Sequence, residues 1–189
     1  DKEIEKLIKE EEKRQKSVVN LIASENYVSD DVLKALGSKL TNKYAEGYPG
    51  KRYYGGNRVI DKIENLCIKR ALKAFKLSPK KWHVNVQPLS GSPANVAVYF
   101  ALVPLRGKIM GMSLSEGGHL THGHKVSITG KFWKQIPYGV NKKTECLNYK
   151  EIQRIARREN PVLIVAGFTA YPRVIDFRTF RKITDFCGA

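Results

Sequence analysis

A turn rich in serine and glycine carries the residue types that bind phosphate. Ser90, Gly91 and Ser92 precede Pro93 and an apolar stretch that ends at Leu102. This order predicts a helix, with Ser92 as its N-cap and Pro93 in its first turn. Free backbone N–H groups, two hydroxyls and the positive end of the helix dipole would then converge on one point, which favours a bound phosphate. An ordinary capped helix is the alternative interpretation.

Three of the four histidines, His119, His122 and His124, lie in one glycine-rich segment, residues 117–124. A metal site usually recruits a carboxylate or thiolate as well, and only Glu116 is adjacent, so we expect no metal here. Two interpretations remain open. A glycine loop could hold an imidazole flat so that it stacks on a planar ligand, or the histidines could make structural hydrogen bonds.

A third segment, residues 43–57, contains four tyrosines, four glycines and one proline. Its apolar residues follow neither the helical nor the strand period, so the segment is predicted to be a loop. Loops that carry large side chains usually contact another group. Together with Lys43, Lys51 and Arg52, its aromatic rings could stack on nucleic-acid bases or on a flat cofactor whose phosphate the cations contact. The lone carboxylate of Glu46 could have a shifted pKa and move protons. Packing on the parent domain, or a surface pair of Glu46 with Lys43 or Lys51, is the alternative.

Other common motifs are missing from the sequence. Neither a Walker phosphate loop nor a G-x-G-x-x-G dinucleotide fingerprint occurs. The three cysteines, Cys67, Cys146 and Cys187, are widely spaced and form no C-x-x-C. This pattern argues against a disulfide framework and a zinc knuckle, and it favours a reducing compartment, the cytoplasm.

The spacing of apolar residues predicts the helices that would position these segments. A charged helix begins the chain, and a short helix runs from the N-cap Ser29 to the stop signal Gly37. Longer helices are expected over residues 58–75, up to Leu102, and over 148–158. A last helix should begin at the cap Asp176 and end before Gly188. It is predicted to face the core through Phe177, Phe180, Ile183 and Phe186.

Strands are predicted between these helices at 84–86, 108–112, 126–128, 132–138 and 161–166, the last as a strand buried on both faces. Helices and strands alternate through the second half of the chain. This alternation predicts an α/β domain with a largely parallel sheet. The pattern ends on a helix with no following strand, so we expect the chain to be the N-terminal portion of a longer protein.

Composition sets wide limits on function. Of 189 residues, 42% are hydrophobic, enough to form a core. The 34 Lys and Arg against 18 Asp and Glu give a net charge of +16. That charge favours anionic partners such as nucleic acid, or simply a solvated basic surface. No apolar stretch reaches the roughly 18 residues of a membrane helix, so no membrane partner is expected.

Five segments resemble the serine hydroxymethyltransferase family. They are LIASEN (21–26), LTNKYAEGYPGKRYYGG (40–56), NVQPLSGSPAN (85–95), GMSLSEGGHLTHG (111–123) and AGFTAYPRVIDF (166–177). The resemblance implies an α/β fold of the aspartate-aminotransferase-like type, fold type I among pyridoxal-phosphate enzymes. Residues 1–42 would form an N-terminal helical arm, and residues 43–189 the first part of the large cofactor-binding domain.

The resemblance also implies an activity. The family interconverts L-serine plus tetrahydrofolate with glycine plus 5,10-methylenetetrahydrofolate, using pyridoxal 5'-phosphate as cofactor and tetrahydrofolate as co-substrate. It implies a cytoplasmic homodimer, or a tetramer, whose active sites are shared between subunits. Nucleic acid is not expected as the main partner. The alternatives to the enzyme are a non-catalytic fragment of this fold and a basic nucleic-acid-binding module. The family's Schiff-base lysine, in a THK motif, and its D-x-A/S-H motif are expected after residue 189.

Family roles extend to the matching positions only. Those that would contact the cofactor are Ser90, Gly91 and Ser92 at its phosphate, Tyr44 at the phosphate of the partner subunit's cofactor, His119 stacked on its ring, and Thr169 at its ring hydroxyl, where the family usually has Ser. Those that would contact substrates are Ser24 and Tyr54 at the amino acid, Glu46 and Tyr53 at folate and the hydroxymethyl group, and Leu114, Gly118 and Leu120 along the pterin. Glu46, Tyr54 and His119 would be the catalytic residues.

Overall fold

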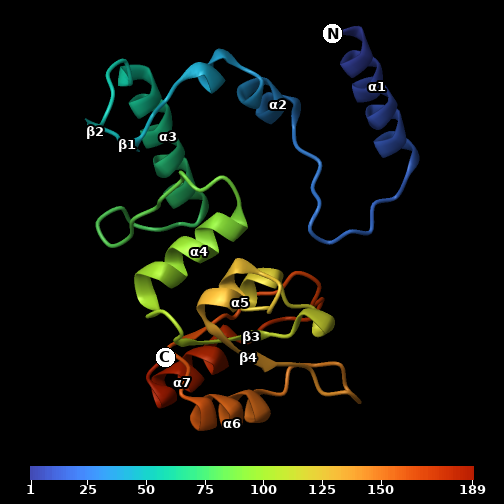
Figure 1. Ribbon diagram of the computed structural model, residues 1–189, viewed down its shortest axis with the longest axis vertical. Helices are drawn as coiled ribbons and strands as arrows, with labels where there is room; N and C mark the ends of the chain where they lie inside the picture. The colour runs from blue at the N-terminus through green and yellow to red at the C-terminus, as the bar shows by residue number, and fades with distance from the viewer. The chain divides into compact units, whose positions relative to one another are not determined.

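The computed structural model describes residues 1–189 as two compact units (Figure 1). One unit comprises Asp1–Asn26 and Asn95–Ala189, and the other comprises Tyr27–Ala94. The expected division into an arm of residues 1–42 and a cofactor domain of residues 43–189 stays a prediction. None of the helices combines the length and the apolar character needed to cross a bilayer.

A three-stranded parallel sheet forms the centre of the first unit. Its strands are β3 (Lys108–Met112), β4 (Lys134–Tyr138) and β5 (Leu163–Ile164), in the order β4-β3-β5. The predicted strand at 108–112 is confirmed, and the one at 132–138 begins two residues later than expected. The strand predicted at 161–166 shortens to two residues of intermediate burial, so its burial on both faces is not found. The parallel sheet confirms the α/β class.

Successive residues of β3 point to opposite faces of the sheet. Met110 and Met112 belong to a core on one face, which α6 (Tyr149–Glu159) and α7 (Phe177–Cys187) cover (Figure 1). Ile109 belongs to a second core on the other face, formed with Tyr99, Val103 and Trp133. The sheet is therefore covered on both sides, as a parallel sheet requires.

The last two helices begin at the predicted caps. The Asn148 side chain accepts the Glu151 N–H at 3.2 Å, and Asp176 accepts the Thr179 N–H at 3.0 Å. Within α7, Phe180 and Ile183 are buried. Phe177 and Phe186 are 60% and 55% exposed, so the prediction that they face inward is wrong. At about 100° per residue the four side chains span half the helix circumference, and only the middle two can face the core.

The helix α4 (Gly91–Leu102) begins earlier than expected, so Ser90 precedes it and Ser92 is its second residue rather than its N-cap. The strand predicted at 126–128 is also wrong. Ser127 instead accepts the Thr129 N–H and caps the short helix α5 (Ile128–Phe132). Three alternating residues are too few to define a strand when a capping serine lies among them. The N-terminal helix α1 (Lys2–Ser17) has no buried residue.

The second unit contains α2 (Asp30–Leu36), the 3-10 turn η1 (Lys39–Asn42) and α3 (Arg58–Ala74). The expected loop at 43–57 includes a small antiparallel hairpin, β1 (Gly47–Tyr48) and β2 (Lys51–Arg52). No strand forms at 84–86, which corrects that prediction. Polar side chains in and next to this segment bond to the hairpin instead. Gln87 Nε2 donates to the Gly47 carbonyl at 2.8 Å, and Asn85 Nδ2 donates to Tyr48 Oη at 3.4 Å.

Candidate functional site

Two loops meet at the carboxyl ends of the parallel strands. Residues 113–123 follow β3, and residues 165–171 follow β5. The carbonyl of Gly117 accepts the N–H groups of Thr169 at 2.9 Å and Ala170 at 3.2 Å. The structure thereby joins the segment that contains His119 to the segment that contains Thr169. Ligands of open parallel sheets bind outside this edge.

Glycines shape the loop after β3 because backbone lies directly against it. Gly117 has a φ of 109°, a left-handed conformation that favours glycine. Gly118 donates its N–H to the Ser113 carbonyl at 2.9 Å, and a Cβ on Gly118 would overlap the Met112 carbonyl. Leu114 and Leu120, the predicted pterin contacts of this loop, are 40% and 42% exposed. The loop therefore presents apolar side chains at the surface.

Glu116 ties the same loop to the segment that follows β4. Its Oε2 accepts the backbone N–H of Val140 at 2.6 Å. A Cβ on Gly139 would overlap this carboxylate, so the glycine makes room for it. The sequence suggested no role for Glu116 beyond being a possible neighbour of a metal, because its partner lies 24 residues away.

His119 and His122 both make hydrogen bonds within the 3-10 turn η3 (Leu120–His122). Nδ1 of His119 accepts the Thr121 N–H at 3.1 Å, and Nδ1 of His122 accepts the His119 N–H at 3.3 Å. Burial, and then the neighbouring His119, lower the pKa of His122 to about 4, so its ring is neutral near pH 7. Both residues therefore make the structural hydrogen bonds that one interpretation predicted, and stacking of the His119 ring on a planar ligand stays a prediction. No group of three or more His, Cys, Asp or Glu residues is arranged to hold a metal ion.

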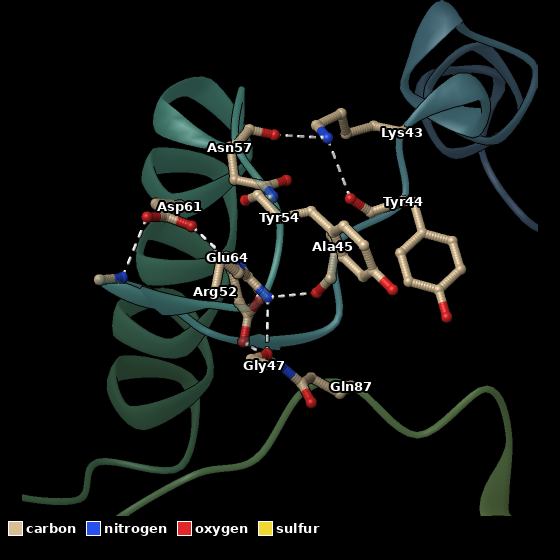
Figure 2. Close-up of polar contacts among 12 residues, drawn as sticks. Lys43, Tyr44, Ala45, Gly47, Arg52, Tyr54, Asn57, Asp61, Glu64 and Gln87 are labelled. Carbon is tan, nitrogen blue, oxygen red and sulfur yellow. Dashed lines mark hydrogen bonds and ion pairs between the residues drawn. The ribbon is translucent and has the colours of Figure 1, made fainter.

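In the second unit, the tyrosine-rich loop brings four predicted site residues together, of which Figure 2 labels Tyr44 and Tyr54. The rings of Tyr44 and Tyr54 meet edge to face, with centroids 5.0 Å apart. Tyr44 Oη donates to Glu46 Oε2 at 3.3 Å. Tyr53 donates its N–H to the Glu46 carbonyl at 3.2 Å, and the residue is 78% exposed. The loop therefore offers one carboxylate beside a phenol hydroxyl, an arrangement able to move a proton.

Arg52 anchors the loop to α3, as Figure 2 shows. Its Nε donates to Asp61 at 2.8 Å and its Nη2 to Glu64 at 2.5 Å. Its Nη1 donates to the carbonyls of Ala45 at 2.6 Å and Gly47 at 2.7 Å. The hydrogen bond from Arg52, and then that from a backbone N–H, hold the pKa of the Asp61 carboxyl below its usual range.

With its side chain only 5% exposed, Arg52 is not available to contact a base or a phosphate, which corrects that prediction. The sequence signal for this burial of Arg52 is the pair Asp61 and Glu64. These acids are three residues apart at the start of α3 and so lie on one helix face.

Neither Lys43 nor Lys51 forms an ion pair with Glu46, so the surface pair considered for that carboxylate is absent. Lys43 Nζ instead donates to the carbonyls of Tyr44 and Gly55 (Figure 2).

Ser90, Gly91 and Ser92 lie at the start of the twelve-residue helix α4 and are all exposed. The first N–H that bonds back is that of Ala94, which donates to the Ser90 carbonyl at 3.2 Å. The N–H groups of Gly91 and Ser92 are therefore free, and a Cβ on Gly91 would meet nothing within 4 Å. Ser24, the remaining predicted site residue, lies in an exposed turn outside any helix or strand.

Comparison with known proteins gives one family. The family model described as serine hydroxymethyltransferase matches residues 1–189. The chain is 54% identical over 189 residues to a serine hydroxymethyltransferase of Mycoplasmopsis synoviae (strain 53), and it covers 44% of that protein. It is also 54% identical to serine hydroxymethyltransferase 1 of Pseudomonas fluorescens (strain Pf0-1), and 52% identical over 194 residues to a serine hydroxymethyltransferase of Caenorhabditis elegans, covering 45% and 38% of them. All of this chain is aligned in each case, and it spans less than half the length of these relatives.

Proposed function

This chain belongs to the serine hydroxymethyltransferase family, and we propose that it contributes to a pyridoxal-phosphate-dependent glycine hydroxymethyltransferase. The reaction interconverts L-serine plus tetrahydrofolate with glycine plus 5,10-methylenetetrahydrofolate. The observation that carries the proposal is the match of the family model over the whole chain. The parallel order β4-β3-β5 is compatible with the aspartate-aminotransferase-like fold that we propose for the complete protein.

The donor set at the start of α4 fits a phosphate group. Two serine hydroxyls and two free backbone N–H groups lie at the positive end of a helix, and no carboxylate occurs from Leu89 to Asn95. In our proposal Ser90, Gly91 and Ser92 hold the phosphate of pyridoxal phosphate. Thr169 offers a hydroxyl for the ring oxygen, and His119 a flat imidazole. When bound, the cofactor supplies electron withdrawal from the Cα of serine, which makes the Cα–Cβ bond easier to break.

The remaining roles concern protons and positioning. We assign Glu46, supported by the Tyr44 hydroxyl at 3.3 Å, to moving a proton at the Cβ hydroxyl of serine and during transfer to folate. Tyr54 and Ser24 orient the amino acid, and Tyr53 meets the folate. Leu114 and Leu120, exposed on either side of Gly118, provide the apolar surface for the pterin.

We further propose a cytoplasmic homodimer, with a tetramer as a possible larger assembly, in which Tyr44 reaches the cofactor phosphate of the partner subunit. The apolar face of α3 supports an assembly, because Val59, Ile63 and Leu66 recur at helical spacing and remain 57%, 41% and 45% exposed. Three free cysteines are compatible with the reducing cytoplasm.

The test uses the complete gene product. We expect it to retain pyridoxal phosphate through purification, to sediment as a dimer or larger, and to form glycine from serine only when tetrahydrofolate is present. A protein that binds no pyridoxal phosphate and forms no folate-dependent glycine would contradict the proposal. Nucleic-acid affinity that falls steeply with salt would then favour the basic binding module instead.

A further inference from the structure

We propose that Asn95 and Thr121 act as positioning residues that fix the tautomer and the orientation of the His119 ring. The inference starts from the backbone of η3. The Thr121 N–H donates to Nδ1 of His119 at 3.1 Å, and a backbone N–H can only be a donor. Nδ1 must therefore present its lone pair, and the hydrogen of the neutral ring lies on Nε2.

The Thr121 hydroxyl strengthens the same constraint. Its Oγ1 lies 2.8 Å from Nδ1 of His119, and it can either donate to or accept from that nitrogen. Asn95, the fifth residue of α4, donates from Nδ2 to this Oγ1 at 2.8 Å. Because the amide supplies a hydrogen to the hydroxyl oxygen, the hydroxyl's own hydrogen is directed to Nδ1. The order Asn95 to Thr121 to His119 is thus a chain of donors that ends on one ring nitrogen.

Burial distinguishes this series of hydrogen bonds from a helix cap on the protein surface. Thr121 is 4% exposed, so no bulk water competes for its hydroxyl. An N-cap needs one acceptor for a backbone N–H, and Ser, Thr, Asp and Asn supply it most often. Here an imidazole has that place, and a helix distant in sequence contributes a second side chain to hold it. The cap alone would require neither the hydroxyl contact nor Asn95.

The neighbouring imidazole does not disturb the arrangement. The rings of His119 and His122 are 5.9 Å apart and tilted by 57°. His122 accepts the backbone N–H of His119 through its own Nδ1. The loop backbone and the His119 ring are therefore fixed by separate partners. Rotation of the His119 ring about its Cβ–Cγ bond would break both contacts at Nδ1.

The consequence for catalysis rests on the proposed function. A ring that stacks on a pyridine face gains most when its plane is held before the cofactor arrives. The hydrogen bonds from Asn95 through Thr121 provide that rigidity and leave the Nε2–H edge of the His119 ring pointing away from Thr121. Weakening these hydrogen bonds should thus lower cofactor affinity without removing the ring itself. Loss of one neutral hydrogen bond corresponds to a change of about threefold to tenfold.

Nitrogen-15 NMR of the complete protein, labelled at histidine and free of cofactor, tests the tautomer directly. His119→Gln assigns the signal. We expect an acceptor-type Nδ1 and a protonated Nε2 in the unaltered protein. Thr121→Val, which removes the hydroxyl, and Asn95→Asp, which replaces the amide donor by an acceptor for the hydroxyl hydrogen, should both shift Nδ1. Thr121→Ser, which keeps the hydroxyl, should leave the Nδ1 signal as in the unaltered protein. Thr184→Val, which removes a hydroxyl from α7 that bonds only to the Arg181 carbonyl, is the matched control.

Each outcome decides the inference. A proton on Nδ1 of His119 in the unaltered protein overturns it, whether or not the variants fold. Nδ1 signals that stay unchanged in both Thr121→Val and Asn95→Asp overturn it as well. If the signals move as expected and the protein still binds no pyridoxal phosphate, then the proposed function fails and the tautomer inference stands. Cofactor affinity that falls in Asn95→Asp but not in Thr184→Val links the two.

Discussion

The Glu116 carboxylate accepts the backbone N–H of Val140 at 2.6 Å, so the loop that follows β3 is tied to the loop that follows β4. The loop after β3 also bonds through the Gly117 carbonyl to the loop after β5. The segment that carries Leu114, His119 and Leu120 is thereby held from two sides by contacts that require the assembled sheet.

Glu116 and Gly139 should be energetically coupled. Gly139→Ala should destabilise the protein because its Cβ would overlap the Glu116 side chain, and Glu116→Ala should cost about 1 kcal/mol through the lost hydrogen bond. In the double variant the added methyl group has room, so the combined loss in unfolding free energy should be smaller than the sum. Urea unfolding of all four proteins measures this cycle. Strict additivity would show that the two positions do not share a contact.

Arg52→Lys should loosen the tyrosine-rich loop. A lysine ammonium cannot reproduce the planar fork that bonds Asp61, Glu64 and two backbone carbonyls at once. We expect faster amide hydrogen exchange across residues 43–57 and a lower melting temperature. Lys51→Ala, on the adjacent exposed residue, serves as control. Equal exchange rates in Arg52→Lys and the unaltered protein would remove Arg52 from its anchoring role.

The stability of the protein should depend on pH through His122. Its pKa is lowered to about 4 in the folded state and is ordinarily near 6.5, so between these values the unfolded chain binds more protons. The contribution is present above pH 6.5 and is lost as the pH falls toward 4, amounting to about 3 kcal/mol at most. Urea unfolding at pH 7.5 and pH 5 measures it. His122→Gln should flatten this part of the pH profile, and an unchanged slope would contradict the assignment.

Glu46→Gln should reduce folate-dependent turnover of serine by about 10²–10⁴-fold, because the amide keeps the size of the side chain but cannot exchange a proton. Cofactor retention should stay close to normal, since Ser90, Gly91, Ser92 and His119, proposed to hold the cofactor, make no contact with Glu46 and Gln keeps a side-chain acceptor for the Tyr44 hydroxyl. Tyr44→Phe removes the hydroxyl that bonds Glu46 and should lower turnover by a smaller factor. Steady-state kinetics and cofactor content are measured on the complete gene product. Unaltered turnover in Glu46→Gln would leave this residue without a part in proton transfer.

Several features could be predicted from the sequence because they depend on neighbours along the chain. The caps Asn148 and Asp176 bond to N–H groups three residues on, and the strand at 108–112 follows from a short apolar run between turn signals. The motifs around Ser90 to Ser92 and His119 identified the family, which comparison with known proteins confirmed. Such signals are local, so the caps and the strand that they predict agree with the observed ones.

The tertiary structure decided which of these residues have partners at a distance. Arg52, a candidate ligand contact in the sequence, is buried by two acids of α3, and the polar residues at 85 and 87 bond to the hairpin instead of forming a strand. Asn95 reaches Thr121 across 26 residues, and Glu116 reaches Val140 across 24. Apolar periodicity predicts which face of an element is buried, whereas a hydrogen bond between distant side chains depends on how the sheet brings its loops together. Only the folded chain determines those pairs.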